Sequence, residues 1–504
     1  MDERRYERLV GALEIRAAKN PGRYRLQAAL TAAFPYFFLL LLLLLLAAAG
    51  PETAAYLTDP GRSPAAMAVL VLLIVPLVVL IGRMATLELR PTYGTEIRVA
   101  DAPRLFRLLR HLRKRLPGPP IHRVVITADF TVAIEQLPRL GLFGAYRNQL
   151  VIGLPMTFAL SSRELGGLIA HEYAHLSPRR LSAWIYRQRR NFERLLQRAG
   201  ERKGDDWMCR LLVAAFGALA IHSKALTFVS ARRDEYEADA ATTRLVGRSR
   251  FASGLIRQAL IGRWLTESFW PKIYSQADLR EKPLFMPYAA MPTAFRAGWK
   301  EWRNPHWLEE AWSKDSSPLE ARPCLRERVA AHDGACKLPG AVRQSAADAL
   351  LGALARELAN RFDAHWWGAE RIAWQRYCRE KQRDWARLAE LDKQSAERLG
   401  AAEMQEYGQL LLAADRCDDA KRVLERLLAS PDELYLQPTL LYGKVLLKEN
   451  DRAGLGHLEK VLKLAPSMAE ECLDAGCKWL AVQQGEAAAK DWFDAMQQHL
   501  QEAA

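Results

Sequence analysis

Two histidines and a glutamate in the segment HEYAH are able to do metal chemistry. His171 and His175 stand four residues apart, so on a helix they lie one above the other on a single face. This spacing lets two imidazoles bind one tetrahedral metal ion, and Glu172 between them reaches a water on that ion. The segment matches the zinc-peptidase pattern H-E-x-x-H. It therefore predicts a Zn²⁺ ion and the hydrolysis of peptide bonds.

An acidic segment farther along the chain offers the third ligand that this metal needs. A catalytic zinc ion takes three protein ligands and keeps one position open for water. Glu235 is the candidate on charge and ligand type. Asp239 lies one helical turn further on the same face, where it can hold a ligand histidine by its other nitrogen. The alternative interpretation of this acidic segment is a solvated helix face.

The HEYAH segment is expected to lie on a helix that begins at Ser161. Ser161 and Glu164 form the capping box S-x-x-E, and an apolar stripe follows. Both histidines should therefore lie well inside this helix. Strands are expected at 123–127 and 149–152, in a small sheet whose edge can pair with an extended substrate. A basic amphipathic helix is expected at 101–116, either on anionic lipid or as a solvated face.

Two apolar runs near the N-terminus predict a transmembrane hairpin over residues 28–86. The first run, 28–50, holds eight consecutive leucines and no charge, and the second covers 65–82. Basic residues flank the pair of runs, so the positive-inside rule places residues 1–27 and everything after residue 83 in the cytoplasm. We therefore expect an integral membrane protein in contact with lipid. The location expected for it is the inner membrane of a bacterium.

The charge and the cysteines argue against two other classes of protein. The net charge is +14, but no run of Lys and Arg is interleaved with aromatic residues, so no nucleic acid is expected as a partner. The seven cysteines form no C-x-x-C pair and no disulfide framework, which is typical of reduced thiols. The length of 504 residues allows two or three domains.

A repeat of 35 residues appears in the C-terminal third of the chain. Tyr407-Gly408 recurs as Tyr442-Gly443, and a weaker third copy includes Gly476. The pattern is similar to tetratricopeptide repeats, which stack helix pairs into a concave surface. We expect residues 341–504 to form a helical-repeat domain that binds a protein partner; the alternative is a helical spacer.

The two metal-binding motifs resemble those of the membrane zinc endopeptidases that include HtpX and the CAAX prenyl protease. That family joins H-E-x-x-H to a downstream E-x-x-x-D, matched here by HEYAH and by Glu235 with Asp239. The resemblance covers about residues 85–335. It implies a mainly α-helical chain whose residues 87–340 form a zincin-type α+β catalytic domain.

The resemblance also implies roles for single residues. Glu172 would be the general base, and the zinc ligands would be His171, His175 and Glu235. Many members carry a histidine-proline pair followed by an arginine. Here Arg322 stands in place of that histidine, and Arg328 becomes a candidate active-site arginine.

The sequence thus predicts a membrane-anchored zinc metalloendopeptidase that cuts proteins or peptides. The resemblance alone implies a place in the quality control of membrane or misfolded proteins. The alternative is a catalytically inactive, membrane-anchored scaffold or adaptor that binds partners through its helical repeats.

Overall fold

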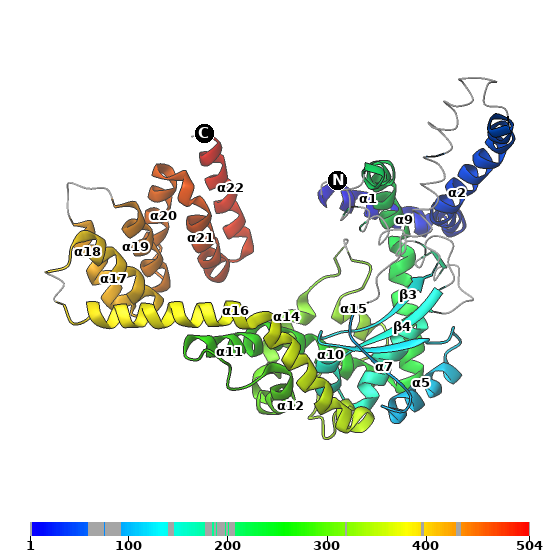
Figure 1. Ribbon diagram of the computed structural model, residues 1–504, viewed down its shortest axis with the longest axis horizontal. Coiled ribbons are helices and arrows are strands. Elements are labelled where there is room, and N and C mark those ends of the chain that lie inside the picture. Colours follow the sequence, from blue (N-terminus) through cyan, green and yellow to red (C-terminus); the bar gives the residue numbers. More distant parts are fainter. Residues whose placement is uncertain are drawn as a thin grey trace. The chain divides into compact units, whose positions relative to one another are not determined.

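A computed structural model describes most of the chain, as a mainly helical protein with one small sheet (Figure 1). The described residues are 3–58, 75, 92–139, 146–176, 184–185, 188, 197, 200, 207–317, 320–394, 398–429 and 435–502. Unit 1 comprises Met1–Ile273 and Phe285–Ala369, and unit 2 comprises Tyr274–Leu284 and Glu370–Ala504. The main division thus follows Ala369, whereas the sequence predicted it after residue 340.

The N-terminal helices pack together with a long helix from the middle of the chain. These helices are α1 (Glu3–Lys19), α2 (Pro21–Thr58) and α9 (Trp207–Val246). Their buried apolar side chains form one cluster, which includes Val10 of α1, Ala28 and Ala32 of α2, and Phe228 of α9. Small alanines allow the helices to approach closely here.

The predicted transmembrane hairpin is contradicted. Among the residues that the structure describes, no helix combines the length and the apolar character needed to cross a membrane. The first expected span, 28–50, lies in α2, where Ala28 and Ala32 are used for packing between helices. The second, 65–82, lies outside the described residues except for Val75. The predicted hairpin and the predicted location in a bacterial inner membrane, facing the cytoplasm, were therefore wrong.

Four strands form one sheet in the order β1-β2-β4-β3. They are β1 (Thr95–Ile97), β2 (Arg123–Thr127), β3 (Val132–Pro138) and β4 (Tyr146–Gly153). The central strands β2 and β4 are parallel, and β1 and β3 pair with them in antiparallel fashion at the two edges. Both strands expected from the sequence are confirmed. Their nearly continuous apolar runs suit a position in the buried middle of a sheet.

Helices of unit 1 cover the sheet and complete its core (Figure 1). The other helices that the structure describes before the repeats are α5 (Pro103–Arg115), α6 (Leu154–Ala159), α7 (Ser162–Ala174), α10 (Arg248–Trp264), α11 (Trp270–Tyr274), α12 (Pro287–Ala297), α13 (Trp299–Trp302), α14 (Pro305–Ser313), α15 (Leu325–Ala330) and α16 (Ala353–Leu391). Single π-helical turns lie at Leu265–Phe269 and Ala347–Leu351, and a 3-10 turn at Ser275–Asp278. The basic helix expected at 101–116 is confirmed as α5.

The predicted capping box at the start of α7 is present and is tied to α10. The Ser161 backbone N–H donates to Glu164 Oε2 at 2.9 Å, and the Glu164 N–H donates to Ser161 Oγ at 3.3 Å. The other carboxylate oxygen, Oε1, accepts from Ser253 Oγ at 2.7 Å and from Arg257 Nε at 3.2 Å. Glu164 and Arg257 are both buried. This pair therefore fixes the first turn of α7 to α10 inside unit 1.

Glu164 should make the stability of unit 1 depend on pH. Burial alone would raise the pKa of Glu164, but Arg257, Ser161 and Ser253 outweigh it and lower the pKa below its ordinary value of 4.5. A lowered folded-state pKa contributes stability above the unfolded pKa, and this contribution is lost as the pH falls through the folded value. We expect Glu164→Gln to lower the free energy of unfolding by about 3 kcal/mol near pH 7, because Arg257 is left buried and unpaired.

Urea denaturation of the wild type and the Glu164→Gln variant, followed by circular dichroism, measures this effect. The difference in unfolding free energy between the two proteins should shrink as the pH falls below about 4.5. An equal difference at about pH 7 and about pH 3.5 would contradict the prediction, since the charge of Glu164 would then be irrelevant.

Three helix pairs make up the C-terminal part of unit 2. They are α17 (Ala401–Ala413) with α18 (Cys417–Leu428), α19 (Leu436–Lys448) with α20 (Ala453–Leu464), and α21 (Ala469–Gln484) with α22 (Glu486–Glu502); a 3-10 turn, Pro466–Met468, precedes α21. The chain here forms successive pairs of helices, as the 35-residue repeat predicts. The recurrent glycines lie where paired helices meet, because a Cβ on Gly408 would collide with Leu424 and one on Gly476 with Trp492.

A close approach between α19 and α20 makes Gly454 sensitive to substitution. A Cβ on Gly454 would lie 2.5 Å from the Gly443 carbonyl oxygen and 2.7 Å from Leu447 Cγ. Backbone atoms of a packed helix cannot move aside as a side chain does. We expect Gly454→Ala to lower the free energy of unfolding by about 1–3 kcal/mol in thermal denaturation, although alanine is the better helix former.

Gly456 on the same helix is the matched control, because an added Cβ there would meet no atom within 4 Å. Gly456→Ala should stabilise by up to about 1 kcal/mol through helix propensity alone. Equal effects of the two substitutions would show that the α19–α20 contact does not constrain position 454.

Candidate metal centre

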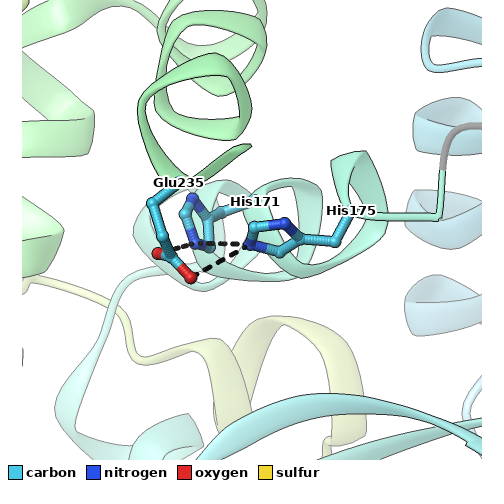
Figure 2. Close-up of side chains that lie close together, drawn as sticks. All are labelled: His171, His175 and Glu235. Atoms are coloured by element: carbon cyan, nitrogen blue, oxygen red, sulfur yellow. Dashed lines mark hydrogen bonds and ion pairs between the residues drawn. The ribbon is translucent and has the colours of Figure 1, made fainter. Parts of the chain in front are cut away.

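His171, His175 and Glu235 come together where the end of α7 meets the middle of α9 (Figure 2). The two histidine Nε2 atoms are 3.3 Å apart. Glu235 Oε2 lies 3.4 Å from His171 Nε2, and Glu235 Oε1 lies 3.6 Å from His175 Nε2. One ligand atom from each residue lies within 4.8 Å of the others. The structure thus brings the three predicted ligands together as two nitrogens and one oxygen, a donor set typical of catalytic zinc.

The Glu235 carboxylate is buried with one oxygen unsatisfied. Its side chain is 7% exposed, and within the described part of the chain Oε2 has no hydrogen bond of good geometry. Burial alone would raise the pKa of Glu235, but His171, His175 and Arg322 hold it far below its ordinary value. An ionised buried oxygen without a hydrogen bond is costly. A cation on the histidine Nε2 atoms would satisfy it, so these residues fit a metal ion.

Two aspartates of α9 hold the outer nitrogens of the histidines. His171 Nδ1 lies 2.8 Å from Asp239 Oδ1, and His175 Nδ1 lies 3.1 Å from Asp234 Oδ2. A ring that donates its Nδ1–H to a carboxylate turns the Nε2 lone pair toward a metal. The sequence predicted this role for Asp239. It did not predict Asp234, whose position directly before Glu235 was the only indication.

Arg328 lies behind these candidate ligands and supports Asp239. Its Nε donates to Asp239 Oδ2 at 2.9 Å and its Nη2 donates to Asp239 Oδ1 at 2.7 Å. The Arg328 side chain is 8% exposed, and its Nη2 lies 3.4 Å from His171 Nδ1. Burial alone would raise the pKa of Asp239, but Arg328 and His171 lower it. Arg328, which the resemblance named as a candidate active-site arginine, is thus placed to position His171 through Asp239.

Glu172 lies at the more open side of the same group, in contact with Arg322. Arg322 Nη2 donates to Glu172 Oε1 at 3.1 Å, and Arg322 Nε lies 3.4 Å from Glu235 Oε2. The Arg322 side chain is 49% exposed and that of Glu172 is 14% exposed. The arginine that stands in place of the family histidine therefore bridges the predicted base and the predicted third ligand.

His175 lies at the end of α7, whereas the sequence placed it well inside this helix. The helix α7 stops at Ala174, and His175 is its C-cap, with φ −64° and ψ −17°. These angles are still helical, so His175 stays on the same face as His171, and the two rings meet edge to face with their centroids 4.9 Å apart. Burial alone would lower the pKa of His175, but Asp234, Glu235 and Glu172 raise it.

Neither a scan against protein-family models nor a search of curated proteins gives a match for this chain. The function is therefore argued from the geometry of the site.

Proposed function

We propose that this chain is a zinc-dependent metalloendopeptidase that hydrolyses peptide bonds in proteins or peptides. The observation that carries the proposal is the convergence of two Nε2 atoms and a buried carboxylate from separate helices, with Glu172 beside them. Bound zinc would polarise the scissile carbonyl and make water a better nucleophile.

The other roles in the reaction belong to side chains of the protein. Asp239 and Asp234 orient the two imidazoles, and Arg328 holds Asp239. Glu172 takes a proton from the attacking water on its carboxylate and returns it to the leaving amine. Arg322 holds that carboxylate in place through its hydrogen bond.

The small sheet offers a way to hold an extended substrate. The strand β3 is at the edge of the sheet and contacts α7, the helix that carries the histidines. An edge strand presents unpaired backbone groups, which can bind a peptide as an additional strand. We propose that the substrate backbone pairs with β3, which favours unfolded or extended segments over compact ones.

Metal analysis and a cleavage assay on one purified preparation test the proposal. We expect about one zinc ion per chain, and cleavage of an unfolded protein such as casein that a chelator stops and added Zn²⁺ restores. His175→Ala should lose both zinc and cleavage. A purified chain without zinc, or cleavage that survives the chelator, would contradict the proposal.

A catalytically inactive adaptor is the second candidate, favoured by the three helix pairs of unit 2. It predicts partner binding that does not depend on His171, His175 or Glu235. The complete donor set and its two supporting aspartates argue against it, because an adaptor has no use for a buried, unsatisfied carboxylate oxygen. A protein partner on these helices remains a prediction.

A further inference from the structure

A separate cavity of about 260 Å³ lies in unit 1, among α6, α10, α12, α13 and residues 341–348. None of the metal-binding residues lines it. Its volume is near the lower limit for a small-molecule site, about 300 Å³, and suits a ligand of one or two fused rings. The lining combines aromatic rings with arginines.

Two tryptophans of α13 give this cavity a rigid aromatic wall. The Trp299 and Trp302 rings meet edge to face, with centroids 4.8 Å apart and an interplanar angle of 87°. The Trp302 Nε1–H donates to the Phe295 carbonyl at 3.0 Å, so that ring cannot turn freely. Arg303 lies over the Trp299 ring, 5.3 Å from its centre. Trp302 is buried with Arg257 over its ring, so a planar ligand would lie against Trp299.

The charged side chains that line the cavity are three arginines and one carboxylate. Arg257 is already neutralised by Glu164 at 3.2 Å, and its Nη2 donates to the Gly340 carbonyl at 2.7 Å. Arg296 donates from Nε to the Pro292 carbonyl, a neutral acceptor.

The other two charged groups of the lining are Asp348 and Arg343. The lining as a whole therefore has an excess of positive charge. The one carboxylate, Asp348, accepts from Ser345 Oγ at 2.7 Å. Within the described residues, neither Arg296 nor Arg343 forms an ion pair with a carboxylate. Two guanidinium groups are thus available to an anion, and their planar forks match carboxylate and phosphate oxygens.

We propose that this cavity binds a small aromatic anion, with its ring against Trp299 and its charged group on Arg296 and Arg343. The proposal is independent of the protease function, because it uses no residue of the metal centre. It does have a structural consequence for that centre. Arg257 lines the cavity and also pairs with Glu164 in the capping box at the start of α7. This ion pair connects the cavity to the helix that carries the two histidines.

Isothermal titration of the full-length protein tests this site with indole-3-carboxylate as the probe. Indole supplies the ring without the charge, and inorganic phosphate supplies the charge without the ring. Indole-3-carboxylate should bind saturably, and each comparison probe should bind at least about tenfold more weakly. Phenyl phosphate, titrated in parallel, shows whether a carboxylate or a phosphate is preferred.

Substitutions at the exposed arginines test whether the probe binds in this cavity or non-specifically. Arg343→Ala and Arg296→Ala should each weaken binding of indole-3-carboxylate by about tenfold. Arg343→Lys should weaken it less, because it keeps the charge and loses only the fork. Arg250→Ala, an exposed arginine of α10 outside the cavity, is the matched control and should change nothing.

Three outcomes would overturn the inference. They are the absence of saturable binding by the aromatic anions, unchanged binding in Arg343→Ala, and phosphate binding as tight as that of indole-3-carboxylate. Circular dichroism of each variant ensures that a loss of binding is not a loss of folding.

Discussion

Replacing Glu172 by glutamine is expected to leave zinc bound and to lower kcat for peptide hydrolysis by about 10²–10⁴-fold, the usual contribution of a general base. Glutamine has the size of glutamate but does not accept a proton at neutral pH. The three ligand residues are unchanged, and the glutamine oxygen can still accept the hydrogen bond from Arg322. Cleavage of a fluorogenic peptide and metal analysis of the same sample measure the two quantities.

The matched control for this substitution is Glu309→Gln, at an exposed position of α14. It removes the same charge from the same unit and should change neither zinc content nor kcat. A Glu172→Gln variant that cleaves at the wild-type rate would place the proton acceptor elsewhere. A variant that loses zinc would make Glu172 a ligand, and the assignment of Glu235 would then need revision.

Asp239→Ala should have two separate effects, on the metal and on the fold. Zinc affinity should fall by about 10–100-fold, because His171 Nδ1 loses the acceptor that orients its ring. The free energy of unfolding should fall by about 3–5 kcal/mol, because Arg328 keeps a buried charge without its partner. Competition with a chelator measures the first effect, and urea denaturation measures the second.

A double variant distinguishes these two effects. Asp239→Ala combined with Arg328→Met removes the buried charge, so it should recover much of the lost stability while zinc affinity stays low. Glu237→Ala, on the same helix but 35% exposed and paired with Arg233, is the matched control and should alter neither property. Wild-type zinc affinity in Asp239→Ala would mean that the Asp239–His171 contact does not orient the ligand.

The parts of the site that were predictable from the sequence depend on local geometry. The spacing of His171 and His175, and the cap at Ser161, involve residues within one or two helical turns of each other. The resemblance named Arg328 as a candidate, but its contact with Asp239 was not predictable, because it depends on how α15 packs against α9 across 89 residues of sequence. Asp234 was missed for a related reason: four acidic side chains share that segment, and only the packing of α7 on α9 selects among them.

The error about the membrane has a similar origin. Hydropathy describes the composition of a run but not what its residues contact. Ala28 and Ala32 count as apolar in such a profile, yet they lie in a helix–helix interface of unit 1, whereas Leu40 and Leu44 further along α2 are exposed. The aromatic and basic cavity was also hidden from the sequence, because its wall comes from three segments, near residues 158, 257–302 and 341–348. The helix pairs of unit 2 were predictable because each repeat is local.

The helix α9 carries Asp234, Glu235 and Asp239 within little more than one turn. Each residue added to or removed from an α-helix rotates everything beyond it by about 100° and shifts it by about 1.5 Å. An insertion or deletion just upstream of Asp234 would therefore disengage the third ligand and both imidazole supports in one event. Over evolution, this stretch can accept substitutions one at a time but no change in length. Insertions and deletions in proteins that descend from this one must therefore accumulate elsewhere.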